Sequence, residues 1–375
     1  MVLGLEKTVS ILLLILLGYF LRGKLIQEDH KKGLKVVILD LSLPAMIFVA
    51  LLGIKMDSEL LLLPVLVLTW NAIMLGVSYF IVPWLGVKPN SPQHRTWMLL
   101  FPSLAPGLSC FPFIIEFLGE EALAWAAIGD VGNKLFVLVI SYLLAMSWYY
   151  RVQHLGAQSN KQKVKSLLLA MLKEPINLVL ISSLLLLSFG FNLSSLPEFF
   201  RSPVLMLKDM MTPLILLFIG VSVVLKWTSI QKIFSILMLR AGISLLISGL
   251  ILTFIPISSA TAVLFLLVFP LSSASFWPFA HMAGIAKLES QNPSGKKTFD
   301  LELAINILAV SLPFSTMLIL SILTGGEYFL SPAPVLTLGG ILCTLPFLPR
   351  LWAQLRSLSF DFETEKSPSL KNSPK

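Results

Sequence analysis

The chain has 375 residues, a formal net charge of +8 and a mean hydropathy of +0.86, with 56% hydrophobic and only 13% charged residues. Ordinary soluble domains carry roughly 25% charged residues. This composition therefore excludes a soluble protein and predicts an all-α polytopic membrane protein, for which we expect no nucleic-acid partner. The two cysteines and four histidines are scattered along the chain, so we expect no disulfide framework, no metal site and no cofactor.

Apolar stretches long enough to cross a bilayer, about 20 residues each, follow one another along the whole chain. We predict eleven spans, near residues 4–21, 35–54, 60–85, 97–118, 121–149, 167–190, 204–225, 233–256, 259–285, 301–323 and 333–350. The first span ends in GYFLRGKL without a small-residue cleavage site, so we do not interpret it as a cleavable signal peptide.

Lysine and arginine gather in alternate connections between these spans. Of the 28 basic residues, 23 lie in one set of connections and in the C-terminal tail, and we count Arg240 with Lys226 and Lys232 in that set. The positive-inside rule then places the N-terminus outside and the C-terminus in the cytoplasm of a cell membrane, either inner or plasma. The basic connection 151–166 is interpreted as a solvated cytoplasmic loop, with a lipid- or partner-binding patch as the alternative. The polar tail 357–375 is expected to be disordered.

Two pairs of spans share a motif at an offset of five spans. Spans two and seven carry Asp-x-x-x-Pro and close with Lys55 and Lys226, and spans four and nine contain the related phrases FPSLAPGLSCFPF (101–113) and FPLSSASFWPF (269–279). An odd offset reverses the direction of the second copy, which predicts inverted five-helix repeats at 1–150 and 167–325. Residues 326–356 add an eleventh span. The motif residues are Asp40, Pro44, Asp209, Pro213, Pro102, Pro112, Pro270 and Pro278.

Proline in a helix interior costs about 3 kcal/mol. In a membrane, such a break is tolerated where the backbone is buried in protein or lines a wet cavity, where half-helix ends can face a ligand. We therefore predict a substrate site at the two breaks. The alternative is a pair of proline kinks whose serines bond to their own helix. The predicted substrate-binding residues are Ser103, Ser109, Pro112, Ser273, Ser275 and Pro278.

Ionisable and amide groups inside spans are costly, which makes them functional candidates. Asp130 and Lys134 are four residues apart and can pair on one helix face, either as a structural ion pair or in coupling to a ligand. A packed histidine is the alternative for His281, and snorkelling to the membrane surface explains Lys208. The predicted coupling or gating residues are Asp40, Asn71, Asp130, Asn133, Lys134, His281 and Asn306.

Three stretches resemble the auxin efflux carrier family: LGYFLRGKLIQEDHKKGLKVVILDLSLPAMIF (17–48), FPFIIEFLGEEALAWAAIGD (111–130) and TPLILLFIGVSVV (212–224). The resemblance covers roughly residues 10–325 and is most specific at the start. It implies two inverted five-helix repeats whose spans four and nine cross at Pro112 and Pro278. Spans one, two, six and seven would form a scaffold, and the others of the ten a moving transport domain.

Members of the family export organic anions, such as indole-3-acetate in plants and malate or malonate in bacteria. The segment LAPGLSCFPF lacks the asparagine that contacts the carboxylate in plant carriers. This absence shifts the expected anion contact to Ser109 and backbone N–H groups. The chain also lacks the long cytoplasmic loop of many plant carriers, so we expect a bacterial-type permease.

The sequence thus predicts a secondary transporter, not an enzyme, that moves a small organic anion by elevator-type alternating access. Membrane lipids are the other expected partner, with a homodimer as one possible assembly. A sodium-coupled carrier of the bile-acid-symporter type, and a non-transporting receptor or assembly protein, remain as alternatives.

Overall fold

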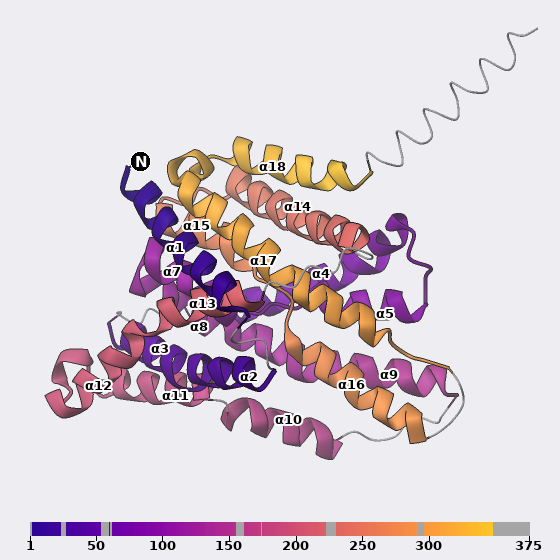
Figure 1. Ribbon diagram of the computed structural model, residues 1–375, viewed down its shortest axis with the longest axis horizontal. Helices are drawn as coiled ribbons and strands as arrows, with labels where there is room; N and C mark the ends of the chain where they lie inside the picture. The colour runs from indigo at the N-terminus through magenta and orange to yellow at the C-terminus, as the bar shows by residue number, and fades with distance from the viewer. Residues whose placement is uncertain are drawn as a thin grey trace, which may run out of the picture.

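The computed structural model describes residues 2–23, 28–53, 60, 62–154, 161–173, 175–222, 230–291 and 296–347, and every regular element within them is a helix (Figure 1). The first half contains α1 (Val2–Leu21), α2 (Glu28–Val36), α3 (Leu43–Leu52), α4 (Leu63–Ile81), α5 (Pro92–Leu100), α6 (Pro106–Ser109), α7 (Phe111–Leu118), α8 (Glu120–Lys134) and α9 (Ser141–Val152). The second half contains α10 (Lys161–Lys173), α11 (Pro175–Ser188), α12 (Glu198–Asp209), α13 (Met211–Ser222), α14 (Ile230–Phe254), α15 (Ala260–Val268), α16 (Phe276–Gln291), α17 (Leu301–Gly325) and α18 (Pro332–Thr344). Two π-helical segments, η1 (Val37–Ser42) and η4 (Leu135–Ile140), join α2 to α3 and α8 to α9.

Seven helical stretches among the described residues are long and apolar enough to cross a membrane. They are Asp29–Leu52, Leu63–Leu85, Glu120–Val152, Glu198–Val221, Gln231–Phe254, Ala260–Ser290 and Leu301–Leu330. Three shorter apolar helices, Val9–Leu21, Pro175–Ser188 and Pro332–Phe347, overlap predicted spans one, six and eleven. The protein is therefore an all-α polytopic membrane protein.

Predicted span six differs from the structure at its start. Residues 167–173 belong to α10, which also includes the last residues of the predicted loop 151–166, and the apolar helix α11 begins only at Pro175. A proline is well suited to the first turn of a helix, where its missing N–H needs no partner. Lys55, Lys226 and the tail 357–375 lie outside the described residues.

Predicted spans four and nine are both interrupted. The chain leaves helical geometry after α5, passes through residues 101–105, and resumes in α6 and α7. In the second segment, α15 ends in a short 3-10 turn (η6, Phe269–Leu271), and residues 272–275 precede α16. We call residues 101–105 and 272–275 the first and second break.

The helix of predicted span eleven, α18, packs closely on α14 (Figure 1). A Cβ atom added to Gly242 of α14 would lie 2.8 Å from the carbonyl oxygen of Gly339 and 2.7 Å from the Sγ atom of Cys343, both in α18. Small residues allow helix backbones to approach in this way inside a membrane. The contact therefore fixes α18 to one side of α14.

Candidate functional site

The two breaks meet and bond to each other. The backbone N–H of Ala105 donates to the carbonyl of Ser273 at 2.8 Å. The N–H of Ser273 donates to the hydroxyl of Ser109 at 2.9 Å, and the N–H of Ser275 donates to the hydroxyl of Ser103 at 3.0 Å. The breaks therefore satisfy part of each other's backbone, which is the requirement for non-helical chain at membrane depth.

The serine hydroxyls of the first interrupted segment hold the crossing together. Ser103 also donates to the carbonyl of Leu100 at 2.8 Å, and Ser109 to the carbonyl of Ala105 at 2.9 Å. Both side chains are fully buried. Each hydroxyl thus donates to a carbonyl of its own segment, as expected for a simple proline kink, and also accepts a hydrogen bond from the second break.

The two predicted prolines lie in the first turns of helices. Pro112 is at the start of α7, and Pro278 is the third residue of α16. Neither residue is among those that line the cavity beside the crossing, whereas Pro106, the first residue of α6, does line it. The fixed φ of proline suits a helix start, so these residues begin the half-helices that follow the breaks.

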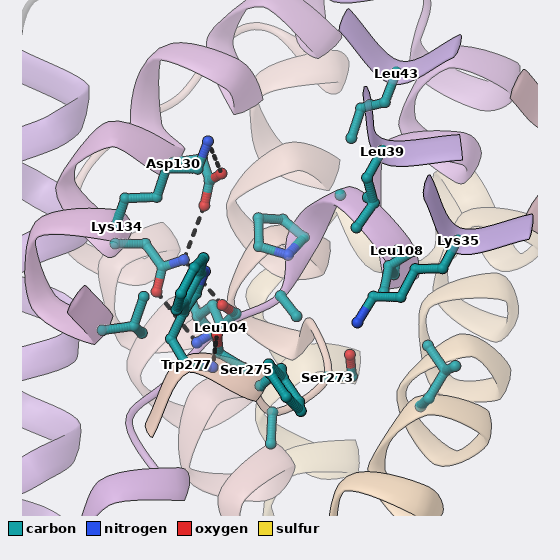
Figure 2. A pocket seen from close by; sticks show the side chains of 18 of the residues that line it. Lys35, Leu39, Leu43, Leu104, Leu108, Asp130, Lys134, Ser273, Ser275 and Trp277 are labelled. Carbon is teal, nitrogen blue, oxygen red and sulfur yellow. Dashed lines mark hydrogen bonds and ion pairs between the residues drawn. The ribbon is translucent and has the colours of Figure 1, made fainter. Parts of the chain in front are cut away.

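A cavity of about 490 Å³ lies beside the crossing. Its walls are formed by α2 and η1, by both breaks and the half-helices that follow them, by α8, and by parts of α11 and α17. Figure 2 shows the Lys35 side chain across the cavity from Asp130 and Lys134. Of the predicted residues, the cavity is lined by Asp40, Asp130, Asn133, Lys134, Ser273 and Ser275.

A buried polar network on α8 holds the first break. Asp130 and Lys134 form an ion pair at 3.5 Å, and Lys134 also donates to Asn177 of α11 at 3.3 Å. The amide nitrogen of Asn133 donates to Asp130 at 2.8 Å and to the carbonyl of Leu104 at 2.9 Å. Its amide oxygen accepts from the N–H of Leu104 at 3.2 Å. The predicted pairing of Asp130 with Lys134 is confirmed.

Asn71 belongs to the same network without lining the cavity. Its amide nitrogen donates to the oxygen of Asn133 at 3.1 Å and to the carbonyl of Pro102 at 3.2 Å. α4 therefore supports the first break from a second direction.

His281 and Asn306 lie elsewhere. The Nε2 atom of His281 is 3.0 Å from the carbonyl oxygen of Val137 in η4, and its ring contacts Tyr142. Asn306 lines a separate cavity of about 370 Å³ together with Lys232 and Asp300. The structure does not bring either residue to the cavity beside the crossing.

Two basic residues near the site escaped the sequence analysis, and one of them requires a correction. Arg240, counted with the basic connections, lies within α14 and is only 5% exposed. Its guanidinium binds backbone carbonyls of both breaks, so it is a residue of the crossing. The available signal was its position seven residues inside predicted span eight.

Lys35 is the first residue of predicted span two (35–54), and it lines the cavity from α2. Its ammonium group lies 4.9 Å from the centre of the Phe276 ring, a cation–π contact. Lys35 stands directly before the apolar stretch VVIL, which places it at the entrance of the span.

No family model matches the chain. The chain is 25% identical over 221 residues to an uncharacterized transporter of Methanocaldococcus jannaschii, a match that covers 58% of this chain and 68% of that protein. It is 27% identical over 146 residues to an uncharacterized transporter of Methanothermobacter thermautotrophicus, covering 37% of this chain and 47% of that protein. Together with the membrane-spanning helices, these similarities show a multi-pass membrane protein related to transporters.

Proposed function

We propose that this protein is a secondary transporter of the auxin efflux carrier type, which carries a small organic anion by elevator-type alternating access. The observation that carries the proposal is the cavity of about 490 Å³ beside two interrupted, mutually bonded helices. A broken-helix crossing with a cavity is a recurrent substrate site in secondary transporters. Catalysis plays no part in this proposal.

The packing of the helices supports a division into scaffold and transport domain. α1 packs on α13, and α3 packs on α11 and α12. In contrast, α4 packs on α8, and α16 packs on α9. These two groups correspond to the spans that the family resemblance assigns to scaffold and transport domain, and α3 also packs on α8 across the boundary between them. The cavity lies between the groups, since η1 and α11 form one side and the breaks and α8 another.

The formal charges that line the cavity are balanced, with Asp40 and Asp130 beside Lys35 and Lys134, and the features that favour an anion are the position of Lys35 and the start of α16. Asp130 is compensated by Lys134. Lys35 offers a positive charge from the opposite wall, although Asp40 also lines the cavity. Phe276 and Trp277 at the start of α16 line it as well, and the N-terminus of a helix carries a positive partial charge.

Binding and flux measurements test the proposal. Purified protein is first screened by thermal shift against malonate, malate, acetate and amino acids, and the stabilising compounds are then used in proteoliposome flux assays. We expect stabilisation by at least one carboxylate and flux of that compound down its gradient. Flux that requires a sodium gradient would favour the sodium-coupled alternative. Binding without flux in sealed liposomes would favour a receptor or assembly protein.

A further inference from the structure

At the crossing, each carbonyl group of residues 101–105 and 272–273 accepts a hydrogen bond. In the first break, Pro102 accepts from Asn71, Leu104 from Asn133, and Ala105 from Ser109. In the second break, Ser273 accepts from the N–H of Ala105. The remaining carbonyls, those of Phe101, Ser103 and Ser272, all accept from Arg240.

Arg240 binds these three carbonyls with its planar guanidinium. Nε donates to Phe101 at 2.7 Å, Nη2 to Ser103 at 2.9 Å, and Nη1 to Ser272 at 2.9 Å. Neither Arg240 nor these three carbonyl-bearing residues line the cavity. The guanidinium therefore holds one side of both breaks from the direction of α14.

This arrangement has an electrostatic consequence for the cavity. A carbonyl oxygen carries a negative partial charge, and in a low-dielectric interior an unpaired carbonyl strongly disfavours a nearby anion. Arg240 holds the carbonyls of Phe101, Ser103 and Ser272 toward α14. In the peptide groups after Ser103 and Ser272, the N–H group therefore points in the opposite direction. The N–H of Leu104 then meets Asn133, and the N–H of Ser273 meets Ser109.

The charge of Arg240 is also uncompensated by a neighbouring carboxylate. Arg240 takes no part in the ion pairs Asp130–Lys134, Glu198–Arg201 and Glu120–Lys208, and its guanidinium binds no carboxylate in the part of the chain that the structure describes. A buried positive charge held only by carbonyl dipoles costs several kcal/mol unless an opposite charge approaches it. A bound anion in the neighbouring cavity would supply that opposite charge.

We propose that Arg240 is the positioning residue that makes the crossing selective for anions, by orienting three backbone carbonyls and by placing one positive charge behind both breaks. The inference rests on the proposed function, because it assigns to one residue the selectivity of the same site. It predicts that Arg240 raises the affinity for a charged ligand relative to a neutral one, and does not merely stabilise the fold.

The test compares charged and neutral forms of one ligand in four proteins. The probes are malonate, malate and acetate, each beside its neutral amide, and the measured quantity is the ratio of acid affinity to amide affinity. The proteins are the wild type, Arg240→Gln, Arg240→Lys and Arg95→Gln. The control Arg95 is also a buried arginine that donates to carbonyls, those of Asn90, Lys297 and Thr298, away from the crossing.

We expect Arg240→Gln to lower the acid-to-amide ratio by about tenfold, the factor that corresponds to about 1.4 kcal/mol. Arg240→Lys keeps the charge but lacks the planar fork of the guanidinium, so its acid-to-amide ratio should lie between that of Arg240→Gln and that of the wild type. Because both affinities are measured on the same protein sample, a fraction of unfolded protein lowers both signals equally and does not change the ratio. Arg240→Lys provides the test if Arg240→Gln does not fold. Arg95→Gln should leave the ratio unchanged.

An equal loss of acid and amide binding in Arg240→Gln would overturn the inference and reduce Arg240 to a structural role. An unchanged ratio in both Arg240 variants would overturn it as well. If the wild type binds no carboxylate of the panel, the proposed function itself fails, and that result is distinct from either outcome at Arg240.

Discussion

The two lysines of the cavity show how a neighbouring group decides the role of a charge. Lys134 is held by Asp130 and Asn177, and all three side chains are buried. Lys35 stands on the opposite wall against the face of Phe276. Since the charge of Lys134 is already matched by a carboxylate, we infer that an incoming anion would meet Lys35, although Asp40 lines the cavity as well.

Substitution of Lys35 tests this assignment. We expect Lys35→Met to weaken carboxylate binding by about tenfold, or about 1.4 kcal/mol, because it removes a charge and keeps most of the side-chain length. Lys35→Arg should retain most of the affinity. The measurement is the dissociation constant by calorimetry or thermal shift, with the exposed loop residue Lys88→Met as control. Unchanged affinity in Lys35→Met would show that the anion does not use this wall.

Sequence spacing predicted one local contact of the site but not the contacts between distant segments. The pairing of Asp130 with Lys134 follows from helical geometry over four residues. The bonds from Asn133 to Leu104, and from Arg240 to both breaks, join residues far apart in the chain. No local pattern determines such contacts, and a lone arginine near a basic connection resembles an ordinary cytoplasmic residue.

Among the described helices, ten of the eleven predicted spans coincide with an apolar helix, of which seven are long enough to cross a bilayer and three are shorter. The prolines correctly indicated which two segments are interrupted. They did not show where the chain leaves the helix, since Pro112 and Pro278 begin helical segments while the breaks lie at 101–105 and 272–275. The π-helical segments η1 and η4, which border the cavity at Asp40 and Val137, have no comparable signature in the sequence.

The helix of predicted span eleven, α18, fixes the position of α14 through their contact. α18 lies against the helix that carries Arg240, through the close approach of Gly242 and Gly339. An element that fixes α14 also fixes the position from which Arg240 reaches the crossing. We therefore infer that α18 moves together with α14.

Enlarging one glycine tests this contact. Gly242→Val should destabilise the protein by about 1–3 kcal/mol, because the new side chain would overlap the backbone of α18. The matched control is Gly340→Val, since a Cβ atom at Gly340 meets nothing within 4 Å. Thermal unfolding in detergent measures both variants. Equal stability of the two would contradict the close packing of α14 on α18.

At the scale of the whole molecule, the ion pair of Lys208 with Glu120 joins the two groups of helices that we assign to scaffold and transport domain. Lys208 of α12 binds Glu120 at the start of α8. α12 lies at one end of the molecule, far from the ends of α5, α9 and α16 (Figure 1). Lys208 also lines a second cavity, of about 550 Å³, together with Ser10 and Asp209. Because Lys208 lies between two helix groups, we propose that it acts as a gate, a more specific role than the snorkelling expected from the sequence.

An elevator motion must separate this pair, because α8 would travel with the crossing while α12 stays in the scaffold. In a background with Cys110 and Cys343 replaced by serine, we expect the double variant Glu120→Cys/Lys208→Cys, bridged by a bifunctional methanethiosulfonate reagent of matching length, to lose flux. Carboxylate binding from the side of the cavity beside the crossing should persist, and a reductant that removes the bridge should restore flux. The control is Glu198→Cys/Arg201→Cys, an ion pair within α12 alone, whose treatment with the same reagent should leave flux intact. Full flux through the bridged Glu120/Lys208 variant would show that α8 and α12 do not move apart during transport.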